Sequence, residues 1–224
     1  MAETNPVSDE EKTTTSEVAA WIRHRIRVGR YVPGQRLVEA DLIRETGGSR
    51  SKVREALQRL AIEGLITIEE FRGASVKRIT WDEVRQIYQA RMVLEGLAAA
   101  EFAAADAPAL KAELVAIQEE MNARMNSGNH DDFARLNDAW HSLIIDGAGN
   151  EYVRQFLARL TVPIYRLLFS TFYNAQRIDD ANADHRVITA AIVEGRADEA
   201  ERAMRAHVRQ GLAALSEISS HFDA

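Results

Sequence analysis

The sequence predicts a mainly α-helical protein in two parts, a winged helix-turn-helix domain followed by an all-α antiparallel helical bundle. Apolar residues recur at helical spacing through most of the 224 residues. Two short strand-like segments, residues 65–68 and 74–79, interrupt this pattern. The charges also segregate, with a balance of +5 over residues 17–80 and −8 over residues 81–224. A basic module on an acidic body indicates that the N-terminal part contacts nucleic acid.

Composition narrows the class of protein. The 46% hydrophobic content is enough for two buried cores. No apolar run approaches the roughly 18 residues of a membrane span, and the N-terminus lacks the apolar core of a signal peptide, so we expect a cytoplasmic protein with no membrane contact. The chain has no cysteine, which excludes disulfides and thiolate ligands and leaves any metal to His, Asp, Glu or Asn.

The chain opens with a polar segment and a helix. Residues 1–16 have nothing to bury, and we interpret them as a disordered arm. Val18, Ile22 and Ile26 then follow at spacings of four, which predicts an amphipathic helix from residue 17 to about Gly29. The DNA-binding domain is therefore expected to span residues 17–80.

A second helix is predicted within residues 37–46, and the turn after it leads into a third helix with two different faces. One face is apolar, because four residues recur at offsets 0, 3, 4 and 7: Val53, Ala56, Leu57 and Leu60. The other face is basic, and its opening turns carry Ser49 as the cap, Arg50, Ser51, Lys52 and Arg54. A recognition helix enters the major groove N-terminus first, so this is the placement that DNA contact requires. The alternative is a solvated surface helix with ordinary arginines.

The two strand-like segments predict a β-hairpin with its turn at residues 71–73. Three helices and a hairpin make a winged helix. Arg72 and Gly73 would stand at the tip of the wing, where they can approach a minor groove or a phosphate strand. A simple hairpin turn without a DNA contact is the alternative.

Four blocks in this order resemble the GntR family of bacterial transcription regulators: Pro33-Gly34-Gln35-Arg36-Leu37, residues 49–60, Glu63-Gly64-Leu65-Ile66 and, at the wing, Arg72-Gly73-Ala74-Ser75-Val76. The resemblance implies that Arg50 and Arg54 contact bases or backbone. It also implies that Ser49, Ser51 and Lys52 assist, and that Arg72 and Gly73 reach DNA through the wing. Ala40 stands where some members have a DNA-contacting arginine, and Gly48 replaces a commoner apolar residue.

Residues 81–224 are expected to be helical throughout. Thr80 and Glu83 have the spacing of a capping box that opens a helix at Trp81. Further helices are predicted to start at residues 106–108, at residues 131–132, at Asn150 with a kink at Pro163, after residues 179–180 and near Asp198. No repeat or strand pattern occurs, so the expected architecture is an antiparallel bundle.

Three histidines of this region lie on apolar stripes: His141, His185 and His207. His185 precedes Gly195 by 10 residues and His207 follows it by 12, so a helical hairpin folded at Gly195 would place them about 15 and 18 Å from the turn. Asn137 precedes His141 by one turn. Three imidazoles and one amide oxygen suit a divalent cation, Zn²⁺ or Ni²⁺ above all, with positions left for water or ligand. The alternative is three core histidines hydrogen-bonded separately.

The remaining histidines, His24, His130 and His221, are assigned to the surface.

The same region resembles the FCD ligand-sensing domain of the FadR subfamily, through Arg91-Met92-Val93-Leu94-Glu95, residues 137–141 with Gly149-Asn150, Asp184-His185 and Ala206-His207. Many members carry Asp where this chain has Asn137. The resemblance implies a metal cavity that receives a small carboxylate effector, and a sensor domain that pairs into a homodimer. Arg91 is the candidate counter-ion for the effector, and an ion pair with Glu95 is its alternative role.

These inferences predict a homodimeric transcription regulator, a repressor, that binds a palindromic operator and responds to a small organic acid bound near the metal. One alternative is a metal sensor without an organic effector. Another is a metal-dependent enzyme fused to a DNA-binding head, but the chain has no H-E-x-x-H helix and no carboxylate spaced as an evident general base.

Overall fold

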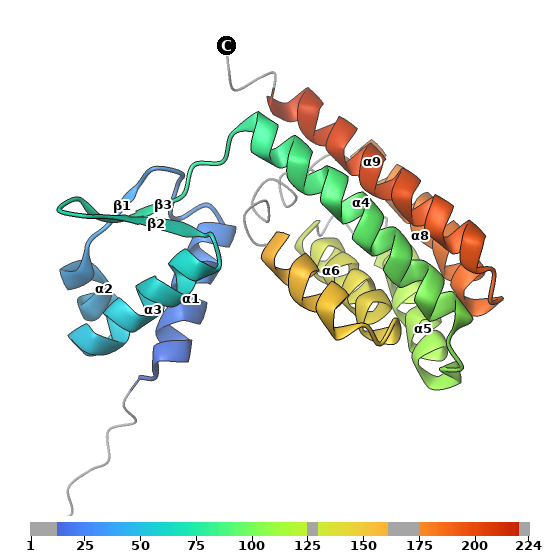
Figure 1. Cartoon of the computed structure of the whole chain (residues 1–224), viewed down its shortest axis with the longest axis horizontal. Helices are drawn as coiled ribbons and strands as arrows, with labels where there is room; N and C mark the ends of the chain where they lie inside the picture. The colour runs from blue at the N-terminus through green and yellow to red at the C-terminus, as the bar shows by residue number, and fades with distance from the viewer. Residues whose placement is uncertain (1–12, 125–129, 161–174, 220–224) are drawn as a thin grey trace, which may run out of the picture. The chain divides into compact units, whose positions relative to one another are not determined.

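The computed structural model describes residues 13–124, 130–160 and 175–219, and the chain divides between Arg78 and Ile79 into two compact units (Figure 1). We call them the N-terminal unit and the helical unit, and each is described by itself. Ile79 packs against the core of the helical unit, which places the division there.

The N-terminal unit is a winged helix-turn-helix. Its helices are α1 (Thr15–Arg27), α2 (Glu39–Thr46) and α3 (Arg50–Ile62), and its strands are β1 (Arg36–Leu37), β2 (Ile66–Glu69) and β3 (Gly73–Val76). The strands form an antiparallel sheet in the order β1-β3-β2, and all three are labelled in Figure 1. The apolar stripe of α3 is fully buried, as its spacing predicts, and α3 packs against α1 and α2.

The sheet differs from the predicted hairpin by one strand. The second helix, α2, begins at Glu39, inside the predicted range of residues 37–46, whereas Leu37 at the start of that range pairs with Ala74 in the short strand β1. A two-residue strand is too short to display an alternating pattern, so no periodicity indicates it. The return strand also ends at Val76 rather than at residue 79.

The first helix begins earlier than the predicted end of the arm. Thr14 caps α1 through a complete capping box, because Glu17 N donates to Thr14 Oγ1 at 3.2 Å and Thr14 N donates to Glu17 Oε2 at 2.6 Å. Residues 13–16 are therefore part of the folded unit. The rest of the expected arm, residues 1–12, lies outside the described residues.

The turn between α2 and α3 requires both of its glycines. Gly47 has φ 68°, the left-handed conformation that closes α2. A Cβ on Gly48 would lie 2.9 Å from Val18 Cγ2, a distance that real side chains essentially never show. The contact between this turn and α1 explains why Gly48 stands where a larger residue is commoner.

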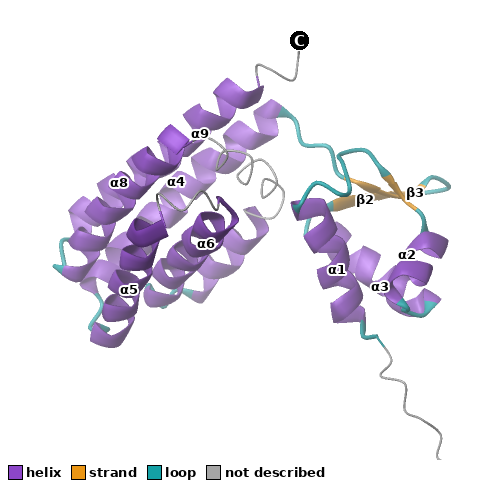
Figure 2. Ribbon diagram, turned by 180° about the vertical axis from the view of Figure 1, so that it is seen from behind, coloured by secondary structure: helices purple, strands orange, loops and turns teal. Residues whose placement is uncertain are grey.

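The helical unit is a bundle of α4 (Trp81–Ala104), α5 (Pro108–Arg124), α6 (His130–Gly147), a helical stretch at residues 151–160, α8 (Ala175–Val193) and α9 (Ala197–Ser219). α9 packs against both α4 and α8, and α5 packs against α6 and α8 (Figures 1 and 2). The capping box of Thr80 and Glu83 is present at the start of α4. The core is one cluster that includes Trp140, Phe102 and Ile188.

One predicted helix start in this unit is wrong. We expected the helix that ends near Gly195 to begin after residues 179–180, but the described part of α8 already begins at Ala175. Carboxylates are favourable within the first turns of a helix and not only before it, so an acidic pair marks the region of a helix start but not the residue. The predicted kink at Pro163 lies outside the described residues.

None of the helices in the described ranges is long and apolar enough to cross a membrane.

Candidate DNA interface and metal centre

The start of α3 is exposed and basic. Ser49 caps the helix by accepting a hydrogen bond from Lys52 N at 3.5 Å, and its Oγ lies 3.0 Å from Ser51 Oγ. The side chains of Arg50 and Arg54 are 72% and 57% exposed. The five residues predicted to contact DNA from this helix are thus brought together at its solvent-facing N-terminus, opposite the buried stripe.

Glu39, which the sequence did not single out, holds the two arginines of this surface. Arg54 Nε donates to Glu39 Oε1 at 2.9 Å and to Oε2 at 3.0 Å, and Arg50 Nε lies 3.5 Å from Oε2. Glu39 is the first residue of α2. An acidic residue at the start of the helix before the recognition helix is the only sequence signal for this role. The contact orients Arg54 while leaving more than half of its side chain exposed.

The wing tip carries the other two predicted DNA contacts. Arg72 is exposed, and its Nη1 donates to Glu69 Oε2 at 3.2 Å, while Gly73 has φ 82°. Phe71 beside them is 96% exposed and has φ 63°, a left-handed backbone conformation that is rare for a bulky residue. The sequence predicted a turn at Phe71 but not that an aromatic ring would project from it.

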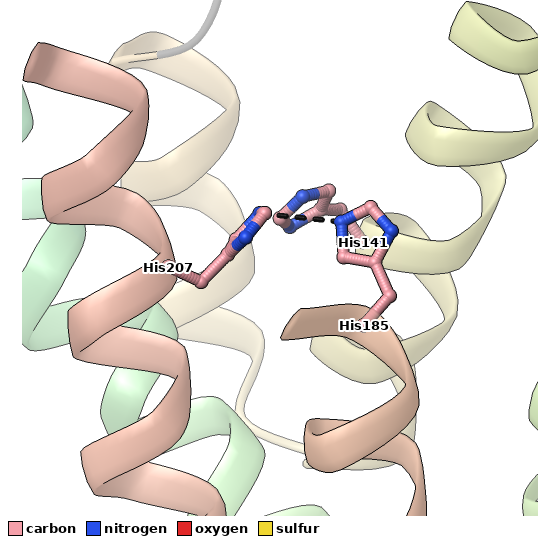
Figure 3. A group of neighbouring side chains, drawn as sticks. All are labelled: His141, His185 and His207. Atoms are coloured by element: carbon pink, nitrogen blue, oxygen red, sulfur yellow. Dashed lines mark hydrogen bonds between the residues drawn. The ribbon is translucent and has the colours of Figure 1, made fainter. Parts of the chain in front are cut away.

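The three predicted histidines converge in the helical unit. His141 from α6, His185 from α8 and His207 from α9 point toward one another (Figure 3), and their candidate ligand atoms all lie within 4.8 Å. His185 Nε2 and His207 Nε2 are 3.2 Å apart. The three rings therefore share one centre, as a common metal ligand set requires.

Carboxylates contact two of the rings from outside the cluster. His207 Nδ1 lies 3.2 Å from Asp184 Oδ2, and His141 Nδ1 lies 3.0 Å from Glu95 Oε2. Among the described residues, His185 Nδ1 has no hydrogen-bond partner, and its ring instead stacks on Trp140 with centroids 4.3 Å apart. Such carboxylates fix the orientation of a metal-binding imidazole. The sequence did not identify this role for Asp184 or Glu95.

Burial keeps two of the rings neutral. Burial, followed by the charges of the neighbouring histidines and Arg177, lowers the pKa of His185 well below its usual value. Burial also lowers the pKa of His207 to about 4, although the contact with Asp184 acts in the opposite direction. A neutral imidazole is the form that binds a metal, so both rings are available as ligands at neutral pH.

One ligand separation in the cluster matches that of a tetrahedral metal. With metal–nitrogen bonds of about 2.0–2.1 Å, two ligands of a tetrahedral Zn²⁺ lie about 3.3 Å apart, close to the separation of the His185 and His207 nitrogens. Asn137 is 9% exposed and stands on α6 one turn before His141. Among the histidines assigned to the surface, His24 is exposed, and the side chains of His130 and His221 lie outside the described residues.

Arg91 forms the ion pair with Glu95 that was the alternative to an effector contact. Arg91 Nε donates to Glu95 Oε1 at 2.7 Å, and both side chains are buried. Burial would raise the pKa of Glu95, but Arg91 and His141 outweigh it and lower that pKa to about 2. Arg91 Nη1 has no hydrogen-bond partner among the described residues, so the ion pair leaves one end of the guanidinium for another contact.

The exposed basic helix, its wing and the buried stripe beneath them define the class of protein, a helix-turn-helix transcription regulator that binds DNA. Residues 14–76 match the family model described as bacterial regulatory proteins, gntR family, and residues 86–210 match the FCD domain. The chain therefore belongs to the GntR family and carries an FCD domain, and it is a regulator rather than an enzyme.

Individual relatives agree with this assignment. The chain is 28% identical over 181 residues, 80% of either chain, to the uncharacterized HTH-type transcriptional regulator YdhC of Bacillus subtilis. It is 32% identical over 142 residues to the gluconate operon transcriptional repressor of the same organism, which covers 63% of this chain and 58% of the repressor. Its fold resembles that of Escherichia coli McbR/YncC, with a TM-score of 0.80 at 20% identity over 92% of this chain and 98% of that one.

Proposed function

We propose that this regulator is a homodimeric repressor whose operator affinity is controlled by a small carboxylate bound beside a divalent metal in the helical unit. The convergence of His141, His185 and His207 on one centre is the observation that carries the proposal. Several relatives are named as repressors, which supports the sign of the regulation.

The metal would be held by the three imidazoles, with the amide oxygen of Asn137 as a fourth ligand. Zn²⁺ and Ni²⁺ are the best candidates, because both accept several imidazoles together with oxygen ligands. Such an ion would supply a Lewis-acidic position for a carboxylate oxygen. Asp184 and Glu95 would keep His207 and His141 oriented toward it.

The effector would be an organic anion. Arg91 offers it Nη1, a buried guanidinium nitrogen with no hydrogen-bond partner in the part of the chain that the structure describes. Arg91 lies one helical turn before Glu95, whose carboxylate contacts His141. A charge-assisted hydrogen bond to this nitrogen would remove the cost of leaving the buried donor unpaired. The name of the gluconate operon repressor is consistent with a sugar acid or a related carboxylate.

The operator would be palindromic. One recognition helix reads only a few base pairs, so two copies related by a dyad are needed for a specific site. In each copy, Arg50 and Arg54 would read bases or backbone, and the remaining contacts would come from Ser49, Ser51, Lys52, Arg72 and Gly73. The effector would act by favouring one spacing of the two DNA-binding units over the other, since a ligand with equal affinity for both would change nothing.

The decisive experiment measures metal, effector and DNA together. Protein purified without chelator is analysed for bound metal, and its affinity for its own upstream DNA is measured with metal, after chelation, and with a panel of carboxylates. The proposal predicts one metal per chain, loss of that metal in His185→Ala, and operator release by a carboxylate only in the metal-loaded protein. Operator release by metal alone would identify a metal sensor instead. If carboxylates released the operator from the metal-free protein as well, the metal would have no role in the response.

A further inference from the structure

A second group of polar side chains lies beside the candidate metal centre. Tyr88 and Arg91 stand one turn apart on α4 and are buried, with the Arg91 Cζ 5.0 Å from the centroid of the Tyr88 ring. The Tyr88 hydroxyl and the Arg91 guanidinium interact with each other, but neither the hydroxyl nor Arg91 Nη1 has a well-formed hydrogen bond within the described residues. A buried polar atom without a full hydrogen bond costs up to about 1–3 kcal/mol, so both atoms favour a further partner.

Arg177, in α8, lies near Tyr88. Gly211, in α9, offers them a surface without a side chain: a Cβ placed there would lie 3.6 Å from Arg177 Nη2 and 3.7 Å from the Tyr88 hydroxyl oxygen. A glycine inside a helix costs about 0.5–1 kcal/mol relative to alanine. Its presence here leaves room beside the phenol and the guanidinium. We call Tyr88, Arg91 and Arg177 the anion cluster.

The anion cluster is close to the three histidines and separate from them. Gly211 follows the candidate ligand His207 by four residues on α9, one helical turn or about 6 Å. Positive charge would thus lie at two places along α9: the metal beside His207, and the two guanidinium groups of the anion cluster about one helical turn further on, near Gly211.

We propose that the effector is a dicarboxylate, with one carboxylate on the metal and the other held by Tyr88, Arg91 and Arg177. This inference rests on the proposed function, whose effector it narrows to a dianion. Glu95 and Asp184 provide counter-charges for the two guanidinium groups but leave the Tyr88 hydroxyl and Arg91 Nη1 to be satisfied. The separation of about one helical turn between the metal centre and the anion cluster corresponds to a dicarboxylate of about four to six carbon atoms.

Calorimetric titration of the metal-loaded full-length protein tests the proposal. The probes are succinate, glutarate and adipate, each compared with the monocarboxylate of the same chain length. Two charge-assisted hydrogen bonds predict that the best dicarboxylate binds about 10- to 100-fold more tightly than its monocarboxylate. Equal affinity of the two acids would overturn the dicarboxylate assignment and leave the metal-linked effector of the proposed function intact. Absence of binding by every acid would also overturn the dicarboxylate assignment, and the wider carboxylate panel of the operator assay would then decide whether the proposed function holds.

Three variants locate the second carboxylate. Tyr88→Phe and Arg177→Gln should reduce the preference for the dicarboxylate to below about threefold while leaving monocarboxylate affinity and metal content unchanged. Gly211→Ala keeps the fold, because its Cβ would make only ordinary contacts of 3.4–3.7 Å, but it fills the space beside the anion cluster and should have the same effect. Equal weakening of both acids by Arg177→Gln would contradict the assignment.

A phosphorylated monocarboxylate, 3-phosphoglycerate, distinguishes the chemical source of the second anion. The proposal predicts that it binds more weakly than the best dicarboxylate. If it binds more tightly than every dicarboxylate, the anion cluster is a phosphate site and the dicarboxylate assignment is wrong.

Discussion

Two arginine–glutamate pairs in this chain have similar geometry and opposite surroundings. In the N-terminal unit, Arg54 and Glu39 are 2.9 Å apart with side chains 57% and 34% exposed. In the helical unit, Arg91 and Glu95 are 2.7 Å apart with side chains 8% and 4% exposed. Water screens the first pair, so a base or phosphate can replace its carboxylate at little cost. The second pair has no water to replace either partner, so it fixes a charge in place.

Among the substitutions that test this contrast, Glu95→Gln is expected to have the largest effect. The substitution leaves the Arg91 guanidinium buried without a counter-charge, and we expect it to lower the free energy of unfolding by about 3–5 kcal/mol. Urea denaturation of the metal-free protein, followed by circular dichroism, measures the loss. Glu39→Gln is the matched control and should cost less than about 1 kcal/mol. Similar losses in the two variants would show that burial does not separate the two pairs energetically.

Acid provides a second test, confined to the helical unit. The pKa of His207 is lowered from its ordinary value to about 4 and that of His185 is also lowered, both chiefly by burial, so in this pH range the unfolded chain binds protons that the folded chain does not. The stability of the metal-free protein should therefore fall as the pH drops from about 6.5 toward 4, by about 1.4 kcal/mol per pH unit for each histidine.

The control for this pH dependence is His207→Gln. Its stability should depend less steeply on pH, by the contribution of one histidine, whether the variant is more or less stable than the parent at neutral pH. Thermal unfolding across the pH series measures both proteins. An unchanged slope would contradict the assignment of the acid sensitivity to this ring.

On the DNA side, Arg54→Ala should weaken binding to the operator by about 1–3 kcal/mol and relax selectivity at the base pair that Arg54 reads. Lys52→Ala should instead weaken binding to operator and random DNA alike and lower the salt dependence by about one ion. Fluorescence anisotropy at several salt concentrations separates the two patterns. If Arg54→Ala weakened binding to operator and random DNA equally, Arg54 would contact phosphate rather than a base.

The smallest expected effect concerns the wing. Phe71→Asn places a residue that tolerates a positive φ at this position, and it should stabilise the N-terminal unit by up to about 1 kcal/mol. The same change should weaken operator binding several-fold, because a projecting ring at a wing tip can pack into a minor groove. Thermal unfolding and anisotropy measure the two quantities. Unchanged DNA affinity would mean that the strained backbone has no role in binding.

The parts of the molecule that the sequence predicted depend on periodicity along one element. The spacing of Val53 and Leu57 predicted the buried face of α3. The nearly equal distances of His185 and His207 from Gly195 predicted that their rings lie together. The parts that it missed depend on register between elements. Glu39 reaches Arg54 from another helix, and Arg177 and Tyr88 both lie beside Gly211, placements that no spacing along a single helix reports.

Trp140 gives the candidate metal centre a practical property. Its ring is fully buried, donates a hydrogen bond to Thr189 at 3.0 Å and lies within 6.3 Å, between centroids, of all three histidine rings. The chain has only two other tryptophans, Trp21 and Trp81. With those two replaced by phenylalanine, the indole becomes an intrinsic fluorophore at the site, and quenching by Ni²⁺ would report the arrival of the ion in real time without an added dye.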